Sequence, residues 1–102
     1  MATFLGTKLV DVNLLEMMDE VQPRKSLDKE VVADYQSIYA DDPTILPPVR
    51  AFQVQKATIL TRGFHRLTGA RKAGIREIQC EMYRGTFQEA QQDAWEDNRE
   101  HG

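Results

Sequence analysis

One short segment of the sequence combines a glycine with two side-chain donors that could bind an anion. The β-forming residues Ile59–Thr61 lead through Arg62 and Gly63 into a basic stretch that contains His65 and Arg66. A strand that runs through a glycine directly into a helix presents free backbone N–H groups and the positive end of the helix dipole. Gly63 would let a phosphate approach the backbone, while His65 and Arg66 would donate to it. The segment therefore predicts a phosphate site.

A simpler interpretation of the same segment stays open, in which Gly63 only makes the turn before a solvated basic face. Within the phosphate interpretation Arg66 is the strongest candidate for a contact, because its planar guanidinium matches phosphate geometry. His65 titrates near neutral pH, so a contact from its imidazole would make binding pH-dependent. Arg62 and Arg71 could add positive charge from the sides.

A weaker candidate site lies near the C-terminus, where Glu96, Asp97 and Asn98 offer the oxygen ligands that Mg²⁺ prefers. Such a run is more often the solvated face of a helix. Cys80 is the single cysteine, and we expect it to be a buried small hydrophobic residue rather than a nucleophile. Asp28 is expected mainly as a helix cap. The sequence contains no Ser/His/Asp triad, zinc-ligand cluster or Walker loop.

Composition limits the remaining classes of function. The chain has 102 residues, of which 41% are hydrophobic and 28% charged, so it is expected to form one domain. Its net charge of −3 provides no attraction of the whole molecule to nucleic acid or to acidic membranes, and any anion site must be local. A single cysteine excludes the disulfide-rich secreted class. Without a signal peptide or a long apolar run, we expect a soluble cytoplasmic protein without a membrane partner.

The elements that must position these residues follow from hydrophobic spacing. Residues Thr7–Asn13 alternate in polarity and predict a short strand. Asp28 opens a helix whose apolar residues recur at three- and four-residue spacing. Two strands then follow, Val49–Val54 and Lys56–Thr61, and they are expected to form a tight hairpin around Gln55.

The second half of the chain continues the alternation of helices and strands. His65–Ala73 predicts a helix closed by Gly74, Ile75–Tyr83 predicts a further strand, and Gly85 with Thr86 opens the last helix. Four aromatic residues at helical spacing are expected in the core: Tyr35, Tyr39, Phe87 and Trp95. The resulting order predicts a small mixed α/β (α+β) domain with a mixed sheet and about three helices, covering residues 1–102.

The order of several short motifs resembles the ParB/sulfiredoxin superfamily over about residues 7–102. Gln22-Pro23-Arg24, followed by Leu27–Val32, is similar to the QPR-containing box of chromosome- and plasmid-partition proteins. Gly63–Arg66 is similar to the glycine-x-histidine-arginine box of sulfiredoxins and of ParB-like nuclease domains. Leu46–Val49 and Ala70–Gly74 match in the same order. The resemblance implies a ParB/sulfiredoxin-like fold that presents the Gly63–Arg66 turn to nucleotide or nucleic-acid phosphates.

The chain also departs from both patterns of this superfamily. Phe64 stands where sulfiredoxins place the catalytic cysteine, so reduction of cysteine sulfinic acid is not expected. Phe64 likewise replaces a glutamate, and His65 an arginine, of the partition-protein box that helps to bind CTP, whereas Arg66 is retained. The sulfiredoxin helix positions that help to hold ATP correspond here to Val31, Asp34 and Ile38.

Three functional hypotheses follow. The first is a DNA-associated phosphate- or nucleotide-binding module, in which Phe64, His65 and Arg66 lie at the site with Gly63, Arg24 and Arg62 nearby. The second is a metal-dependent nuclease or nucleotide hydrolase, with His65 and Arg66 as catalytic residues and Mg²⁺ on the C-terminal carboxylates. The third is a decayed site that serves protein interaction or inhibition, with an exposed Phe64 as the anchor.

The resemblance also sets expectations about the setting of the chain. A nucleoside triphosphate with Mg²⁺ is the implied cofactor, DNA or a nucleotide the implied partner, and a plasmid or phage the implied context. A homodimer and a protein partner stay open as alternatives. Partition proteins continue into a helix-turn-helix domain that reads DNA, and no such domain is expected within residues 1–102.

Overall fold

A mixed four-stranded sheet forms the centre of the protein in the computed structural model, which describes residues 1–22 and 27–101, with the side chains of 98–101 left aside. The strands are β1 (Thr3–Asp11), β2 (Val49–Val54), β3 (Ala57–Arg62) and β4 (Glu77–Arg84), and they lie in the order β1-β4-β2-β3. β4 pairs antiparallel with β1 and parallel with β2, and β2 pairs antiparallel with β3. The predicted mixed sheet is therefore confirmed.

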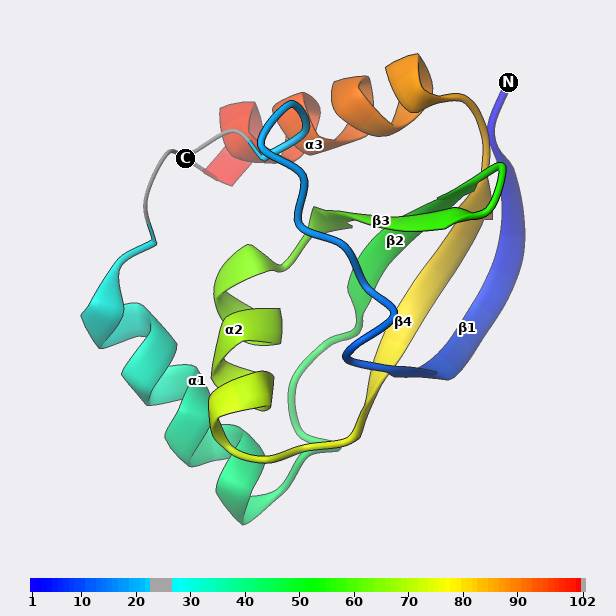
Figure 1. Ribbon diagram of the computed structural model, residues 1–102. Coiled ribbons are helices and arrows are strands. Elements are labelled where there is room, and N and C mark those ends of the chain that lie inside the picture. Colours follow the sequence, from blue (N-terminus) through cyan, green and yellow to red (C-terminus); the bar gives the residue numbers. More distant parts are fainter. Residues whose placement is uncertain (23–26, 102) are drawn as a thin grey trace.

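Three helices cover the two faces of this sheet (Figure 1). They are α1 (Lys29–Asp41), α2 (Phe64–Lys72) and α3 (Phe87–His101). Leu60 belongs to the main core with Leu67 and Ala70 of α2, whereas its neighbour Ile59 packs with Ala94 of α3. Because successive strand residues point to opposite faces, α1 and α2 lie on one side of the sheet and α3 on the other. The predicted α/β class with three helices is confirmed.

The first strand begins earlier than the alternation indicated. β1 starts at Thr3, which pairs with Arg84, and its register shifts between Phe4 and Gly6. Gly6 has a φ of +107°, a conformation that glycine adopts without steric cost. The irregularity interrupts the two-residue period, and the predicted strand Thr7–Asn13 therefore missed the first residues of β1.

The hairpin between β2 and β3 forms where it was predicted. Val54 pairs with Ala57, so Gln55 and Lys56 make a two-residue turn. Gln55 has a φ of +56°, which is left-handed and is required by tight hairpin turns of this length. The second strand accordingly begins at Ala57 rather than Lys56.

The helix ends follow the predicted caps, but one aromatic residue was placed wrongly. The Asp28 side chain accepts from the backbone N–H groups of Glu30 and Val31, as an N-cap does. Gly74 follows α2 with a φ of +77°. Tyr39 is buried, yet Trp95 is 56% exposed, so the predicted core position of Trp95 was wrong. The side of α3 that faces the sheet is lined by small residues instead, namely Ala90 and Ala94.

Candidate functional site

The candidate site begins at the turn that joins β3 to α2. Gly63 is the residue before α2 and has a φ of +97°. A Cβ atom at this position would lie 2.6 Å from Cγ1 of Val49, a side chain that is fully buried. Glycine is therefore required here for two reasons, its backbone conformation and the close approach of β2. The predicted strand-glycine-helix arrangement is present.

The first turn of α2 has no side-chain cap. The first intrahelical bond runs from Leu67 N–H to the Gly63 carbonyl, and within the described residues the backbone N–H groups of Phe64 and Arg66 have no acceptor. The other two helices differ, because α1 is capped by Asp28 and α3 by a reciprocal pair of bonds between Thr86 and Glu89. Uncapped N–H groups at the positive end of a helix dipole favour an anion.

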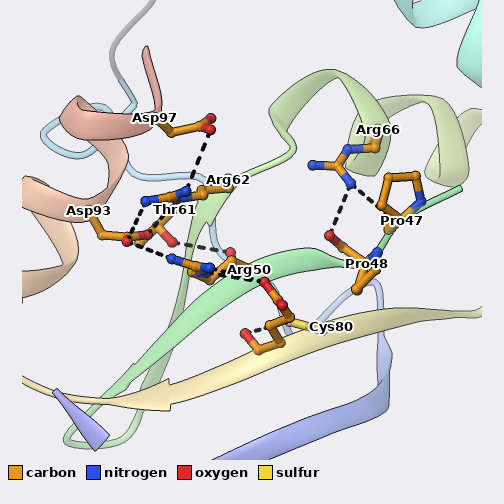
Figure 2. A network of polar contacts seen from close by, with 10 residues as sticks. Pro47, Pro48, Arg50, Thr61, Arg62, Arg66, Cys80, Asp93 and Asp97 are labelled. Atoms are coloured by element: carbon orange, nitrogen blue, oxygen red, sulfur yellow. Dashed lines mark hydrogen bonds and ion pairs between the residues drawn. The ribbon is translucent and has the colours of Figure 1, made fainter. Parts of the chain in front are cut away.

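Arg66 lies beside this turn and is partly committed to the backbone of a neighbouring loop. Its Nη1 atom donates to the carbonyl oxygens of Pro47 at 2.7 Å and Pro48 at 3.0 Å, as Figure 2 shows. Its Nη2 atom lies 3.2 Å from the position that a Cβ on Gly63 would take. Neither Nη2 nor Nε donates to an acceptor in the described part of the chain, so the guanidinium retains donors beside the uncapped turn.

His65 links the beginning of α2 to the beginning of α1. Its Nε2 atom accepts a hydrogen bond from the backbone N–H of Asp28 at 3.1 Å. The imidazole therefore helps to place the two helix starts side by side, a role that sequence spacing could not show.

Arg62 immediately precedes Gly63, but its guanidinium is directed toward α3. Its Nη2 and Nε atoms donate to the two carboxylate oxygens of Asp93 at 2.9 and 3.1 Å, and its Nη1 atom lies 3.8 Å from Asp97 (Figure 2). Arg50 on β2 donates to the same Asp93 carboxylate at 2.9 Å. These side chains form an ion-pair network that holds α3 against the sheet. Sequence reasoning missed Arg50 and Asp93 because they lie 43 residues apart.

Two further predicted contributors lie elsewhere in the structure. Arg71, expected to add charge to the site, donates instead to the carbonyl oxygens of Val12 and Leu15, with its shortest bond at 2.6 Å. Phe64 is partly buried and packs against the main core. The hypothesis of a protein-interaction module offered Phe64 as an anchor if it is exposed, and this side chain is partly buried.

The remaining predicted residues are separated from the turn or lie outside the described residues. Glu96 accepts a hydrogen bond from Gln92 one helical turn earlier at 3.2 Å, and Asp97 faces Arg62. The Asn98 side chain and Arg24 lie outside the described part of the structure. Among the described residues no group of three His, Cys, Asp or Glu side chains is placed to hold a metal ion.

Cys80 has the environment that was predicted for it. The side chain is fully buried in the main core, and burial raises the pKa of the thiol to about 12. A thiol with this pKa is protonated at neutral pH and is not a nucleophile. No helix in the described part of the chain is long and apolar enough to cross a membrane.

Comparison with known proteins relates this arrangement to several solved structures. The chain superimposes with a TM-score of 0.78 on the C-terminally truncated chromosome-partitioning protein ParB from Caulobacter crescentus complexed with CTP-gamma-S, at 16% identity over 91% of this chain and 52% of that one. The TM-score is 0.69 for sulfiredoxin from Arabidopsis thaliana, at 16% identity over 86% of this chain and 96% of that one.

A third structure, ParB from Caulobacter crescentus complexed to the centromeric parS site, gives a TM-score of 0.60 at 18% identity over 70% of this chain and 37% of that one. The chain thus spans about half of the first ParB structure and less of the other. Neither a protein-family model nor a curated protein matches the sequence. The structural matches show that the chain has a ParB/sulfiredoxin-like fold.

Proposed function

We propose that the chain is a DNA-associated module that binds the phosphate groups of a nucleotide or of a DNA backbone at the turn between β3 and α2. The proposal rests on the position of Gly63, where the uncapped first turn of α2 and the remaining donors of Arg66 lie side by side. Backbone N–H groups and a guanidinium fork are the donors that proteins use for phosphate.

The solved structures of the same fold support this ligand class by analogy. ParB was solved in one case with CTP-gamma-S and in another with the parS site, so this fold is compatible with both a nucleotide and DNA. A shared fold does not transfer a function by itself. The proposal for this chain therefore rests on its own Gly63–Arg66 turn, and the analogy selects the ligands to be tested.

A binding function agrees better with the described side chains than the two alternatives from sequence. The hydrolase hypothesis needs Mg²⁺ on Glu96, Asp97 and Asn98, whereas Glu96 and Asp97 have partners within the protein. Sulfur chemistry has no support, because Phe64 occupies the cysteine position and Cys80 is buried. The protein-interaction hypothesis has less support from Phe64, because this side chain is partly buried and packs against the core.

A calorimetric titration tests the proposal. The wild-type protein is titrated with CTP, ATP and GTP in the presence of Mg²⁺, and with single- and double-stranded DNA, at low and at physiological salt. The matched variant is Arg66→Gln, because glutamine can still donate to the Pro47 or Pro48 carbonyl and so retains part of the loop contact. We expect the wild type to bind at least one of these ligands and Arg66→Gln to bind it at least tenfold more weakly.

The control variant is Arg76→Gln, which removes the same charge from an exposed residue after the end of α2. Its affinity is expected to stay close to that of the wild type, apart from a small long-range effect that salt removes. Absence of binding by the wild type to every nucleotide and to DNA would refute the proposal. Equal weakening by Arg66→Gln and Arg76→Gln would show a non-specific effect of charge instead of a site.

A further inference from the structure

The two edges of the sheet, β1 and β3, differ in what covers them. The β3 edge is covered in its middle, because the N–H of Glu16 donates to the Thr58 carbonyl and the Glu16 carbonyl accepts from the N–H of Leu60. Among the described residues β1 pairs with β4 alone, and Figure 1 shows it as the outermost strand on the right. β1 has nine residues and is the longest of the four strands. A long edge strand without a neighbour is a template for pairing with another strand.

The hydrogen bonds to β4 determine which residues of β1 face the outer edge. The N–H of Val12 donates to the Arg76 carbonyl at 3.0 Å, in the same register as the pairs of β1 with β4. Backbone groups alternate in direction along an antiparallel strand, so those of Thr7, Leu9 and Asp11 point away from β4. In the described part of the chain, the outward groups of Thr7 and Leu9 have no hydrogen-bond partner.

The same stretch of β1 carries an exposed apolar side chain. Leu9 is 59% exposed although it lies within the strand. Its partner on β4 is Gln79, which alternates with the core residues Ile78 and Cys80. Leu9 therefore lies on the face of the sheet opposite to α1 and α2. On that face α3 packs against β3 and β2, and Leu9 remains in solvent.

We propose that β1 pairs antiparallel with β1 of a second copy of this chain through Thr7–Asp11, so that two sheets join across a two-fold axis at Leu9. Each Leu9 then exchanges both backbone hydrogen bonds with its counterpart, and the two exposed side chains lie opposite each other. Thr7 lies opposite Asp11 of the second copy, whose carbonyl also accepts from Leu14 at 3.0 Å and has a second lone pair. This inference does not depend on the proposed phosphate site.

The charges and the bulge of β1 favour a second copy in this register. Pairing centred on Lys8 would set two lysines directly opposite each other, which is destabilising. Pairing centred on Thr7 would set Leu9 against the irregular segment near Gly6. Pairing centred on Leu9 uses the regular part of the strand and places each charged side chain opposite an uncharged one. The strand is thus complementary to itself, as a symmetric dimer requires.

Analytical ultracentrifugation over a range of protein concentrations tests the proposal with Leu9→Lys and Leu9→Glu. Like charges opposite each other at the axis should weaken dimerisation about tenfold or more in each variant. An equimolar mixture of the two variants should associate more strongly than either variant alone, because residue 9 of one copy faces residue 9 of the other. The control is Leu14→Lys, which replaces a leucine of 62% exposure outside β1 and should dimerise as the wild type does. Circular dichroism checks that each variant is folded.

Amide hydrogen exchange locates the interface on β1. The N–H groups of Lys8 and Val10 point toward β4, so they should be protected at every protein concentration. The N–H groups of Thr7 and Leu9 should exchange rapidly in dilute protein and become protected as the concentration rises. Leu9→Lys should remove this concentration dependence and leave the protection of Val10 unchanged.

Three results would overturn the proposal. A wild type that stays monomeric at high concentration would exclude a second copy and leave a strand of another protein as the occupant of the edge. A dimer that persists in both Leu9 variants would use a different surface. Equal weakening by Leu14→Lys and Leu9→Lys would show non-specific association through exposed leucines.

Discussion

At Gly63 the addition of a single Cβ atom would make the turn between β3 and α2 clash with Val49. The φ of +97° is unfavourable for any residue with a Cβ, and the fully buried Val49 leaves no room for one. The donors of the proposed site depend on this turn, because Gly63 sets where α2 begins and where Arg66 can lie. The proposed site therefore depends on a glycine at position 63.

Gly63→Ala should destabilise the fold by about 2–4 kcal/mol, since it combines a strained backbone with a clash against Val49. Gly74→Ala is the matched control, because Gly74 also has a positive φ, of +77°, but no atom lies within 4 Å of the position that its Cβ would take. Its cost should be about 1 kcal/mol from the backbone alone. Urea unfolding of the two variants measures the difference, and equal losses would show that contact with Val49 is unimportant.

Sequence reasoning identified the residue types at the turn but not the partners of their side chains. Gly63, His65 and Arg66 were recognisable because they are neighbours in the chain. The acceptors of Arg66 lie at Pro47 and Pro48, 19 and 18 residues away, and the donor to His65 lies at Asp28, 37 residues away. Such contacts depend on how α1, α2 and the loop before β2 pack together, and no local pattern encodes them.

At the scale of elements, α2 is held at both ends by charged or polar side chains that contact backbone atoms of other segments. His65 connects its first turn to Asp28, and Arg71 near its last turn donates to the Val12 and Leu15 carbonyls. Both carbonyls belong to buried residues of the segment that follows β1. Arg71 therefore fixes α2 to the segment that follows β1 and does not contribute to the proposed anion site.

Arg71→Ala should lower the free energy of unfolding by about 2–3 kcal/mol, because it leaves two carbonyl oxygens without their charged donor. The neighbouring Lys72→Ala removes the same charge from an exposed side chain and should change stability by less than about 0.5 kcal/mol. Chemical denaturation of both variants measures this difference in the free energy of unfolding. A loss in Lys72→Ala as large as that in Arg71→Ala would contradict the structural role given to Arg71.

The elements themselves were largely predictable, and the errors have physical causes. The caps at Asp28 and Gly74 and the hairpin at Gln55 were visible because each depends on local backbone chemistry. The start of β1 was missed because the bulge near Gly6 interrupts the alternation. Trp95 was misplaced because the side of α3 against the sheet uses small side chains, and helical spacing alone does not tell which side is covered.

At the scale of the whole molecule, the proposed local site for anions belongs to a chain whose net charge is −3. Arg62, which directly precedes Gly63 in the chain, forms ion pairs with Asp93 and Asp97 of α3. The molecule as a whole therefore offers little general attraction to polyanions, and the proposed recognition depends on the α2 turn. Because such a site would contact few phosphate groups, we expect its binding constant for DNA to depend only weakly on salt concentration.

Whole-molecule stability should fall at alkaline pH because of Cys80. Burial raises the pKa of its thiol from 9.0 to about 12, so the folded protein retains a proton that the unfolded chain releases. This contribution is complete below pH 9 and is lost as the pH rises toward 12. Between about pH 8 and about pH 10.5 the wild type should lose about 2 kcal/mol more than Cys80→Ala in urea unfolding. Parallel pH profiles for the two proteins would contradict this expectation.

The most direct test of the central claim is a chemical-shift map of the backbone amides during titration with a nucleoside triphosphate and Mg²⁺. If the α2 turn binds phosphate, the largest shifts should occur at the N–H groups of Phe64, His65 and Arg66, with a smaller response at Val49, which follows the two prolines. Saturable shifts confined to these residues are the predicted result. Shifts centred on another surface, or none with saturating nucleotide and none in the same titration with DNA, would contradict the proposed site.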